Sequence, residues 1–321
     1  MTGRPSDEQT HALVVAARMY YEDELSQDEI AARLGKSRPT ISRMLTAARR
    51  QGIVHIDIRV PLERSLPLER ALQERFRLAD VRVVLAPTGD PDSADHLGRA
   101  AAAYLQSVVR DGMTVGVSNG RSLAAAVRFL QPERSIHQTV VQILGALGHD
   151  NPAIDSPDIA RAIGLAYDAQ CRYLHLPLLV ESVAVKQTLL RGPNAAQSLK
   201  LGAEADLALV GIGTLDPTNR SPIFEGLITQ RELARVRQSG AIAHICGEFY
   251  TATGARAEVD VNDRVISIGL AALKRIPTVV AVAGGGSKAG AIIAGIKGGY
   301  VNTLITDDRA AERMLRAVAP H

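Results

Sequence analysis

Short apolar runs alternate with helical segments from residue 68 to residue 305, and this pattern constrains the fold more than any other feature. A strand that is apolar throughout is buried on both faces, and strands separated by helices form parallel sheets with helices on each side. We therefore predict an α/β fold with a doubly wound parallel sheet. The predicted strands are 81–85, 113–117, 140–144, 207–212, 242–246, 279–283 and 302–305, and the clearest helices between them are 92–110, 122–130 and 159–169.

The first sixty residues follow a different, all-helical pattern. Apolar residues recur at helical spacing over 8–23. Ser26 and Glu29 form a capping box for a second short helix, which Gly35 ends. Ser37 is a plausible N-cap for a third helix, and alternation over 54–60 predicts a strand after it. Two short helices around a glycine turn predict a helix-turn-helix.

The third helix combines an apolar face with a basic, hydroxyl-rich face. No acidic residue lies between Arg33 and Arg50. In the major groove such a helix presents its N-terminal side chains to base edges, while Arg and Lys near its ends neutralise phosphates. The alternative is a solvated basic helix in a packing bundle, but the capping box and the turn favour DNA. We expect Ser37, Arg38, Thr40, Ser42 and Arg43 at or near the bases, and Lys36, Arg49 and Arg50 at phosphates.

Composition limits the partners and the compartment. The net charge is only +3, so nucleic-acid binding has to come from a local patch. Aromatic residues make up 3% and Trp is absent, which argues against base-stacking surfaces for single strands. The two cysteines, Cys171 and Cys246, show no disulfide framework or metal spacing. With no signal peptide and no apolar run near the roughly 20 residues that span a bilayer, we expect a cytoplasmic protein without membrane contact.

Three glycine-rich connections follow predicted strands, at residues 116–123, 211–216 and 284–288. Glycines let backbone N–H groups approach an oxyanion, and the start of a helix favours negative charge. Each loop alone is equally consistent with a plain connection, but three in one sheet favour an anionic ligand. None has a P-loop ending or a full dinucleotide fingerprint. The candidate ligand residues in these loops are Asn119, Gly120, Arg121, Ser122, Gly213, Thr214 and Lys288.

Other polar residues offer weaker candidates. His244 and Glu248 could bind hydroxyl groups of the ligand, or could be a structural histidine and a solvated acid. The acids Asp206, Asp216 and Asp260 do not form a metal-binding set with Asp263, so we expect neither a metal nor a cofactor. Ser122 has no recognisable triad partners, and we therefore expect no catalytic residues.

The chain resembles the SorC family of bacterial sugar-responsive transcription regulators over nearly its whole length. The resemblance is carried by residues 20–31, 37–43, 52–54, 140–142, 211–213, 276–285, Lys288 and 298–307. It implies a helix-turn-helix fused to a Rossmann-like effector domain related to sugar-phosphate isomerases and deaminases. It also implies a homotetramer, double-stranded operator DNA as partner, and a phosphorylated sugar as effector. By matching position, the effector contacts fall on Gly120, Arg121, Ser122, Gln142 and Lys288.

Three positions depart from the family pattern. Asn119 stands where the family often has an aromatic residue, and His244 stands where many members have an acid. Leu144 occupies a position at which one Schiff-base-forming type has Lys, so we do not expect covalent capture of the effector here.

The expected organisation is a DNA-binding domain over 1–60 and an effector-binding and oligomerisation domain over 61–321, with Pro61 and Pro67 marking the linker. The expected function is regulation of a carbohydrate operon under control of a phosphorylated sugar. A sugar-phosphate isomerase or deaminase with an accessory DNA-binding module is the alternative, because fold alone does not determine function.

Overall fold

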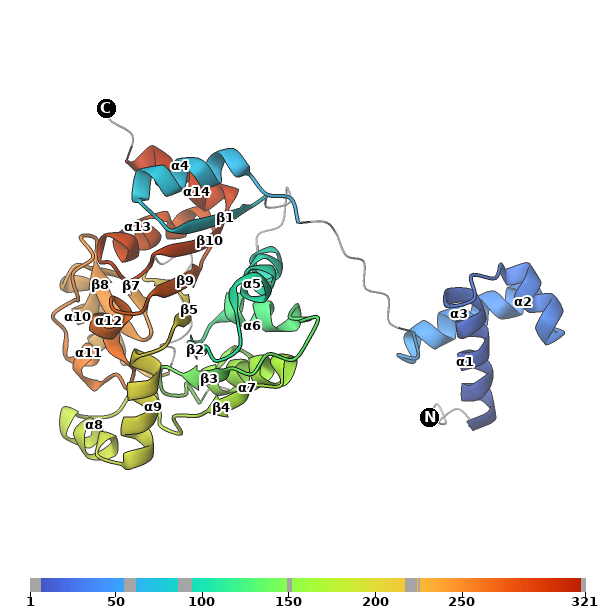
Figure 1. Cartoon of the computed structure of the whole chain (residues 1–321), viewed down its shortest axis with the longest axis horizontal. Coiled ribbons are helices and arrows are strands. Elements are labelled where there is room, and N and C mark those ends of the chain that lie inside the picture. Colours follow the sequence, from blue (N-terminus) through green and yellow to red (C-terminus); the bar gives the residue numbers. More distant parts are fainter. Residues whose placement is uncertain are drawn as a thin grey trace. The chain divides into compact units, whose positions relative to one another are not determined.

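The computed structural model describes residues 7–54, 62–85, 94–148, 152–216, 224 and 226–318. The chain divides into two compact units, Met1–Pro61 and Leu62–His321, and both are drawn in Figure 1. Residues 55–60 of the strand predicted after the third helix lie outside the described residues.

Over its described residues, 7–54, the first unit contains three helices, α1 (Asp7–Tyr21), α2 (Gln27–Leu34) and α3 (Arg38–Arg50). The predicted capping box is present: Ser26 N–H donates to the Glu29 carboxylate at 2.8 Å, and Glu29 N–H donates to Ser26 Oγ at 3.3 Å. Gly35 ends α2 with φ of 61°, a conformation that glycine adopts without strain. Apolar side chains of α2 and α3 pack around Ile30 and Ile41, which are fully buried. The helix-turn-helix prediction is confirmed.

The second unit is built on a seven-stranded, all-parallel sheet, which confirms the predicted α/β class (Figure 1). Its strands are β1 (Asp80–Val84), β2 (Thr114–Val117), β3 (Thr139–Gln142), β4 (Gln170–Arg172), β5 (Leu207–Gly211), β9 (Thr278–Val282) and β10 (Thr303–Asp307). They lie in the order β1-β10-β9-β5-β2-β3-β4. The chain winds from β2 to β3 and β4 toward one edge, and from β5 to β9 and β10 toward the other. The direction of winding therefore reverses between β2 and β5.

Helices cover both faces of this sheet, and each face has its own core. On β10, Leu304 belongs to one core and Ile305 to the other, because successive side chains of a strand point to opposite faces. The core around Leu304 includes residues of α4 (Leu66–Phe76), α13 (Ala289–Lys297) and α14 (Asp308–Ala317). The core around Ile305 includes residues of α5 (Ala94–Val108), α6 (Arg121–Arg128) and α7 (Ser156–Tyr167).

One predicted strand was assigned to the wrong sheet. Residues 242–246 fall in β7 (Ala241–Ile245), which lies in a separate antiparallel sheet between β6 (Gly213–Thr214) and β8 (Glu248–Thr251). The reason is a tight turn at Cys246 and Gly247, whose φ angles of 49° and 82° return the chain at once as an antiparallel strand. The further helices of the second unit's described residues are α8 (Val183–Leu190), α9 (Pro193–Ala203), α10 (Gln230–Gln238), α11 (Asp260–Arg264) and α12 (Gly269–Leu273). The sequence had given no bounds for these five, nor for α4, α13 and α14.

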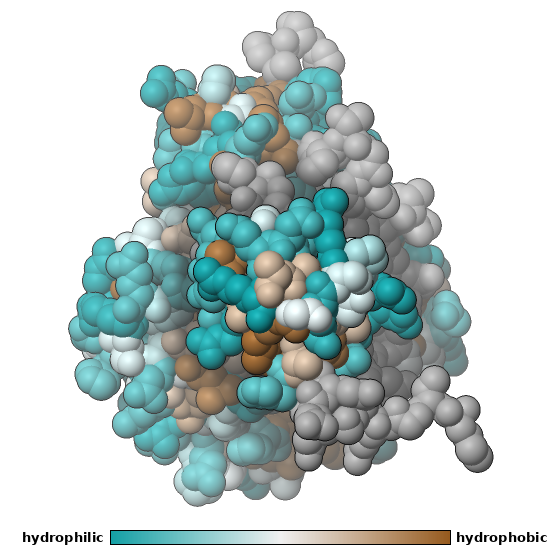
Figure 2. Space-filling view, turned by 90° about the vertical axis from the view of Figure 1, so that its right-hand side faces the viewer, coloured by the Kyte–Doolittle hydropathy of each residue, from teal (hydrophilic) through white to brown (hydrophobic). Residues whose placement is uncertain are grey.

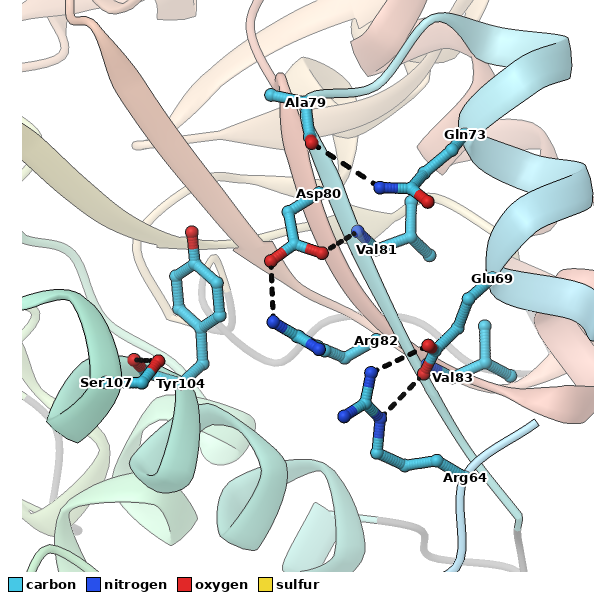
Figure 3. Close-up of polar contacts among 10 residues, drawn as sticks. All are labelled: Arg64, Glu69, Gln73, Ala79, Asp80, Val81, Arg82, Val83, Tyr104 and Ser107. Atoms are coloured by element: carbon cyan, nitrogen blue, oxygen red, sulfur yellow. Dashed lines mark hydrogen bonds and ion pairs between the residues drawn. The ribbon is translucent and has the colours of Figure 1, made fainter. Parts of the chain in front are cut away.

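The edge strand β1 is closed off by side chains and by the segment that precedes α4 (Figure 3). Glu69, which is buried, accepts two hydrogen bonds from the Arg64 guanidinium at 2.8 and 2.7 Å and one from Val83 N–H at 2.9 Å. Val81 N–H donates to the Asp80 carboxylate at 2.8 Å. These contacts satisfy donors that an exposed edge would offer to another strand, and they fix the chain where the second unit begins.

Hydrophilic side chains cover most of the face seen in Figure 2, and apolar ones gather in small patches between them. Among the described residues, the large apolar side chains that are exposed are Tyr21, Leu66, Leu85, Leu165, Val183 and Val185. No helix in the described ranges is long and apolar enough to cross a membrane.

Candidate functional site

The basic face of α3 points outward from the first unit. Ile41, Leu45 and Ala48 are buried on its inner face, which leaves the polar face open. Arg and Lys side chains on an open helix face are accessible to the phosphates and base edges of DNA. The residues predicted to contact DNA are exposed at Lys36, Ser37, Arg38, Ser42, Arg43, Arg49 and Arg50, and half-buried at Thr40.

Local contacts set the roles that these side chains can take. Ser37 Oγ accepts from Thr40 N–H at 3.4 Å and lies 2.8 Å from Thr40 Oγ1, so both hydroxyls serve the helix cap. Arg43 Nε donates to the Pro39 carbonyl at 3.3 Å, a long contact. Arg38 lies 3.7 Å from Asp28, and both side chains are largely exposed. Exposed pairs of this kind contribute about 0–1 kcal/mol, so Arg38 can exchange Asp28 for DNA at little cost.

Two of the three glycine-rich loops meet where the sheet reverses its winding. Ser118 follows β2, its N–H donates to the Leu209 carbonyl at 3.0 Å, and its Oγ accepts from Gly211 N–H at 3.3 Å. A Cβ on Gly211 would lie 3.2 Å from the Asn119 carbonyl oxygen. The loops after β2 and β5 are therefore in direct contact. Ligands of doubly wound sheets bind at this position, outside the carboxyl ends of the strands.

The loop after β2 leads into α6 through Gly120. Its φ of 128° lies in the region that favours glycine, and its N–H donates to the Ile154 carbonyl at 2.9 Å. Asn119 is buried, and its Nδ2 has no hydrogen-bond partner among the described residues. Arg121 is exposed and Ser122 half-buried in the first turn of α6. The structure thus brings a cation, a hydroxyl and an unpartnered amide together at this end of the sheet.

The third loop, after β9, is held by Asp307 at the end of β10. Gly285 N–H donates to Asp307 Oδ2 at 2.6 Å, and Lys288 N–H donates to the Gly285 carbonyl at 2.9 Å. Gly284 has no room for a side chain, because a Cβ there would lie 2.4 Å from Asp307 Oδ2 and 2.7 Å from Leu97 Cδ1. Asp307 is fully buried and also caps α14 through Ala310 N–H at 2.8 Å. It therefore fixes the backbone that carries Lys288.

His244 lies in β7 opposite Gly213, close to the second and third loops. Its ring packs against Phe224 and Phe249, with centroids 5.1 and 5.7 Å away. A Cβ on Gly213 would lie 1.9 Å from His244 Nε2, so only glycine leaves space for this ring. Burial, helped by the charge of Lys288, lowers the pKa of His244 to about 3. The ring is therefore neutral, and its Nε2 has no hydrogen-bond partner among the described residues.

Two other predicted effector residues, Gln142 and Thr214, already have partners within the chain. Gln142 Nε2 donates to the Leu144 carbonyl and to Ser156 Oγ, both at 2.9 Å, and its Oε1 accepts from Leu174 N–H at 3.0 Å. Thr214 Oγ1 accepts from Asp216 N–H at 3.1 Å. These contacts suit side chains that shape the loops around a ligand.

Glu248 has partners too, and it faces away from His244. It is buried, accepts from Leu270 N–H at 2.9 Å and lies 3.6 Å from Arg256. It is directly opposite Ile245 in the β7–β8 pair, whereas His244 is opposite Phe249. Directly opposed residues share a face and successive residues alternate, so Glu248 and His244 lie on opposite faces of the small sheet.

Two buried acids near the loops, Asp155 and Asp307, were not among the site residues predicted from the sequence. Asp155 accepts from the N–H groups of Leu147, Gly148 and Ser156 at distances from 2.7 to 3.2 Å. Asp307 lies two residues beyond the strand predicted at 302–305, in the run 298–307 that carried the family resemblance, and this resemblance is the one signal that could have singled it out.

Comparison with known proteins assigns both units. Residues 60–316 match a family model described as a sugar-binding domain, and residues 11–51 match the model of sigma-70 region 4. The chain is 32% identical over 304 residues to the deoxyribonucleoside regulator of Bacillus subtilis, which covers 94% of this chain and 96% of that protein.

The chain belongs to the SorC family of sugar-binding transcriptional regulators.

A solved structure and a further relative in sequence agree with this assignment. The full-length sorbitol operon regulator SorC of Klebsiella pneumoniae has a TM-score of 0.72 at 26% identity, covering 96% of this chain and 100% of that one. The transcriptional regulator LsrR of Escherichia coli is 32% identical over 305 residues, 94% of this chain and 93% of that protein. These relatives are transcriptional regulators, so this member of the SorC family is a regulator and not the isomerase or deaminase that the sequence left open.

Proposed function

We propose that this SorC-family regulator binds double-stranded operator DNA through α3 and that a phosphorylated sugar, bound in the second unit, modulates that binding. The DNA contacts are Lys36, Ser37, Arg38, Thr40, Ser42, Arg43, Arg49 and Arg50. The observation that carries the proposal is the outward-facing basic side of α3 in a chain whose remaining residues match a sugar-binding domain. Arg38 and Arg43 read base edges, and the other basic residues set affinity through phosphates.

The effector occupies the space bounded by the three loops. Arg121 and Lys288 supply positive charge for the phosphate, and Ser122 supplies a backbone N–H donor in the first turn of α6. Gly120, whose own N–H is bonded to the Ile154 carbonyl, gives the loop the backbone conformation that leads into α6. Asn119 and His244 carry buried polar atoms without partners, which sugar hydroxyls would satisfy. A buried polar group that lacks a partner costs about 1–3 kcal/mol, so a ligand that supplies one gains affinity and selectivity.

Gln142, Gly213, Thr214 and Glu248 take supporting roles in this site. Gly213 makes room for the His244 ring, and the other three hold loops through the bonds described above. Leu144 is fully buried and supplies no amine, so the effector is held without a covalent bond.

We further propose that residues 61–321 assemble the chain into a homo-oligomer, a tetramer, in the cytoplasm. A dimer of helix-turn-helix units reads half-sites about 34 Å apart, one helical turn of DNA. The effector changes DNA affinity only if it binds one arrangement of the units more tightly than the other.

The proposal is tested with the purified full-length chain and duplexes from the promoter region of its own operon. Fluorescence anisotropy measures the affinity for each duplex and for a random duplex of equal length, with and without a panel of sugar phosphates. Selective binding that one sugar phosphate alters is expected. Thermal denaturation with the same panel reports effector binding independently of DNA, because a ligand of the native state raises the melting temperature.

A further inference from the structure

Helix α8 presents apolar side chains to solvent. Its eight residues include Val183, Val185, Leu189 and Leu190, yet none of the eight is buried. Among described helices of eight or more residues, every other one buries at least one side chain. Val183 and Val185 are 43% and 41% exposed, and they are two of the six exposed large apolar residues in the described ranges. An apolar helix face left open on a folded unit is typical of an interface.

The helix is nevertheless fixed in position. Ser182 caps its start, accepting from Val185 N–H at 3.2 Å. Leu189 and Leu190 pack at the edge of a small core that contains Leu174 and Ile266. The exposed valines are therefore held on an ordered element, as a preformed contact surface requires.

Beside α8 lies a cavity of about 350 Å³. Val183, Lys186, Gln187 and Leu190 line it from α8, and Arg256 and Asp263 line it from the other side. Arg256 lies 2.9 Å from Asp263 and 3.6 Å from Glu248. Lys186 is half-buried, and within the described ranges its ammonium group has no ion pair or hydrogen bond. The patch thus combines exposed valines, a hollow with apolar walls, a cation without a close partner and an acid, Asp263, that is 55% exposed.

We propose that α8 and this cavity form an isologous contact with a second copy of the same chain, with Lys186 of each copy set against Asp263 of the other. This contact presupposes the homo-oligomer of the proposed function, and it identifies the surface through which two copies of the chain meet. A two-fold contact places one patch against itself, so the patch has to be self-complementary in shape and charge. Here the exposed valines of one copy fit the hollow of the other, and Lys186 of one copy meets Asp263 of the other. A stable contact buries about 800 Å² per partner, so it extends from α8 onto α11.

Charge reversal with mixing of two variants tests this pairing. A two-fold dimer contains two such charge pairs, one on each side of the axis. In Lys186→Glu both pairs place an acid against an acid, and in Asp263→Lys both place a cation against a cation. When the two variants are mixed, each contact pairs opposite charges again. Light scattering after size exclusion should therefore give a reduced mass for each variant alone and the wild-type mass for the mixture. Leu165→Asp, at an exposed leucine on α7, is the control and should keep the wild-type mass.

Pairing within one chain cannot produce this rescue, because neither variant alone carries the restored pair. Val183→Asp combined with Val185→Asp should also lower the mass, with an unchanged circular dichroism spectrum. Wild-type mass in each single charge variant, or no recovery on mixing, would overturn the α8 contact. A monomeric wild type would overturn the homo-oligomer as well, whereas operator binding, measured separately, tests the regulator function itself.

Discussion

The backbone N–H of Gly285 donates to Asp307 Oδ2 across 2.6 Å, and this bond ties the Lys288 loop to the end of β10. Asp307 is the Cα partner of Val84 in β1, and Val84 in turn forms an antiparallel bridge with Arg64. Three adjacent backbone segments therefore connect the proposed phosphate loop with the place where the chain enters the second unit. A displacement of this loop would therefore have a short path to Arg64, near the start of the second unit.

Gly284→Ala tests the packing of that loop. The added methyl group would collide with Asp307 Oδ2 and Leu97, and overpacking of this kind costs about 1–3 kcal/mol. We expect a lower free energy of unfolding and weaker sugar-phosphate binding, measured by denaturant titration and calorimetry. Gly290→Ala is the matched control on α13, since its Cβ would meet no atom within 4 Å. Equal behaviour of the two variants would contradict the packing described for the loop.

Lys288→Ala should weaken binding of the sugar phosphate about 10- to 100-fold, because a hydrogen bond to a charged group contributes about 1.5–3 kcal/mol. Operator affinity without effector should stay at the wild-type value. Lys297→Ala is the control, at an exposed lysine in the last turn of α13, the helix that follows Lys288. Calorimetric titration measures the affinity of both variants for the sugar phosphate. Wild-type affinity in Lys288→Ala would show that the phosphate does not bind at Lys288.

Arg43→Ala should reduce operator affinity about 10- to 100-fold, since a bidentate contact to a base contributes about 1–3 kcal/mol. Its effector binding should be unchanged, because the substitution lies in the other unit. Arg316→Ala removes a largely exposed arginine from α14 and serves as control. Fluorescence anisotropy with the operator duplex measures the DNA affinity of both variants. Wild-type affinity in Arg43→Ala would contradict a base contact by Arg43.

His244 makes stability depend on pH in acid. Its pKa is about 3 when folded and 6.5 in the reference state, so the unfolded chain binds a proton that the native chain excludes between these values. The contribution of neutral His244 is fully present above pH 6.5 and is lost as the pH falls toward 3, by up to about 1.4 kcal/mol per pH unit. Urea unfolding between pH 7 and pH 5 should show a steeper fall for wild type than for His244→Asn. Equal slopes would contradict the buried, neutral ring.

The helix-turn-helix was predictable because its determinants are local. Ser26 with Glu29, and Gly35 after α2, define helix ends within a few residues, and the apolar spacing of α3 assigns its exposed face. The inner strands of the parallel sheet were predictable for a similar reason, since they are apolar on both faces. The edge strand β4 was not predicted, because its three residues are polar or half-buried and give no apolar run. Strand partners are a non-local property, however, and the apolar run at 242–246 is compatible with either sheet until the turn at Gly247 is seen.

Site chemistry was only partly accessible from the sequence. Loop glycines marked the three connections, and the structure brings the first two into contact through Ser118 and Gly211. Sequence could not reveal that Gln142 and Glu248 already have hydrogen-bond partners, because those partners lie elsewhere in the chain. For the same reason it gave no role to Asp307, whose importance depends on the neighbouring loop after β9.

The most direct test of the central claim is the affinity of the full-length chain for its operator duplex, measured by anisotropy over a titration with sugar phosphates. The account predicts tighter binding to one promoter-region duplex than to random DNA, and a shift of at least about tenfold with one sugar phosphate, a coupling of about 1.4 kcal/mol. That shift should disappear at the same effector concentration in Lys288→Ala. Equal affinity for all duplexes, unaffected by any of the sugar phosphates, would contradict it.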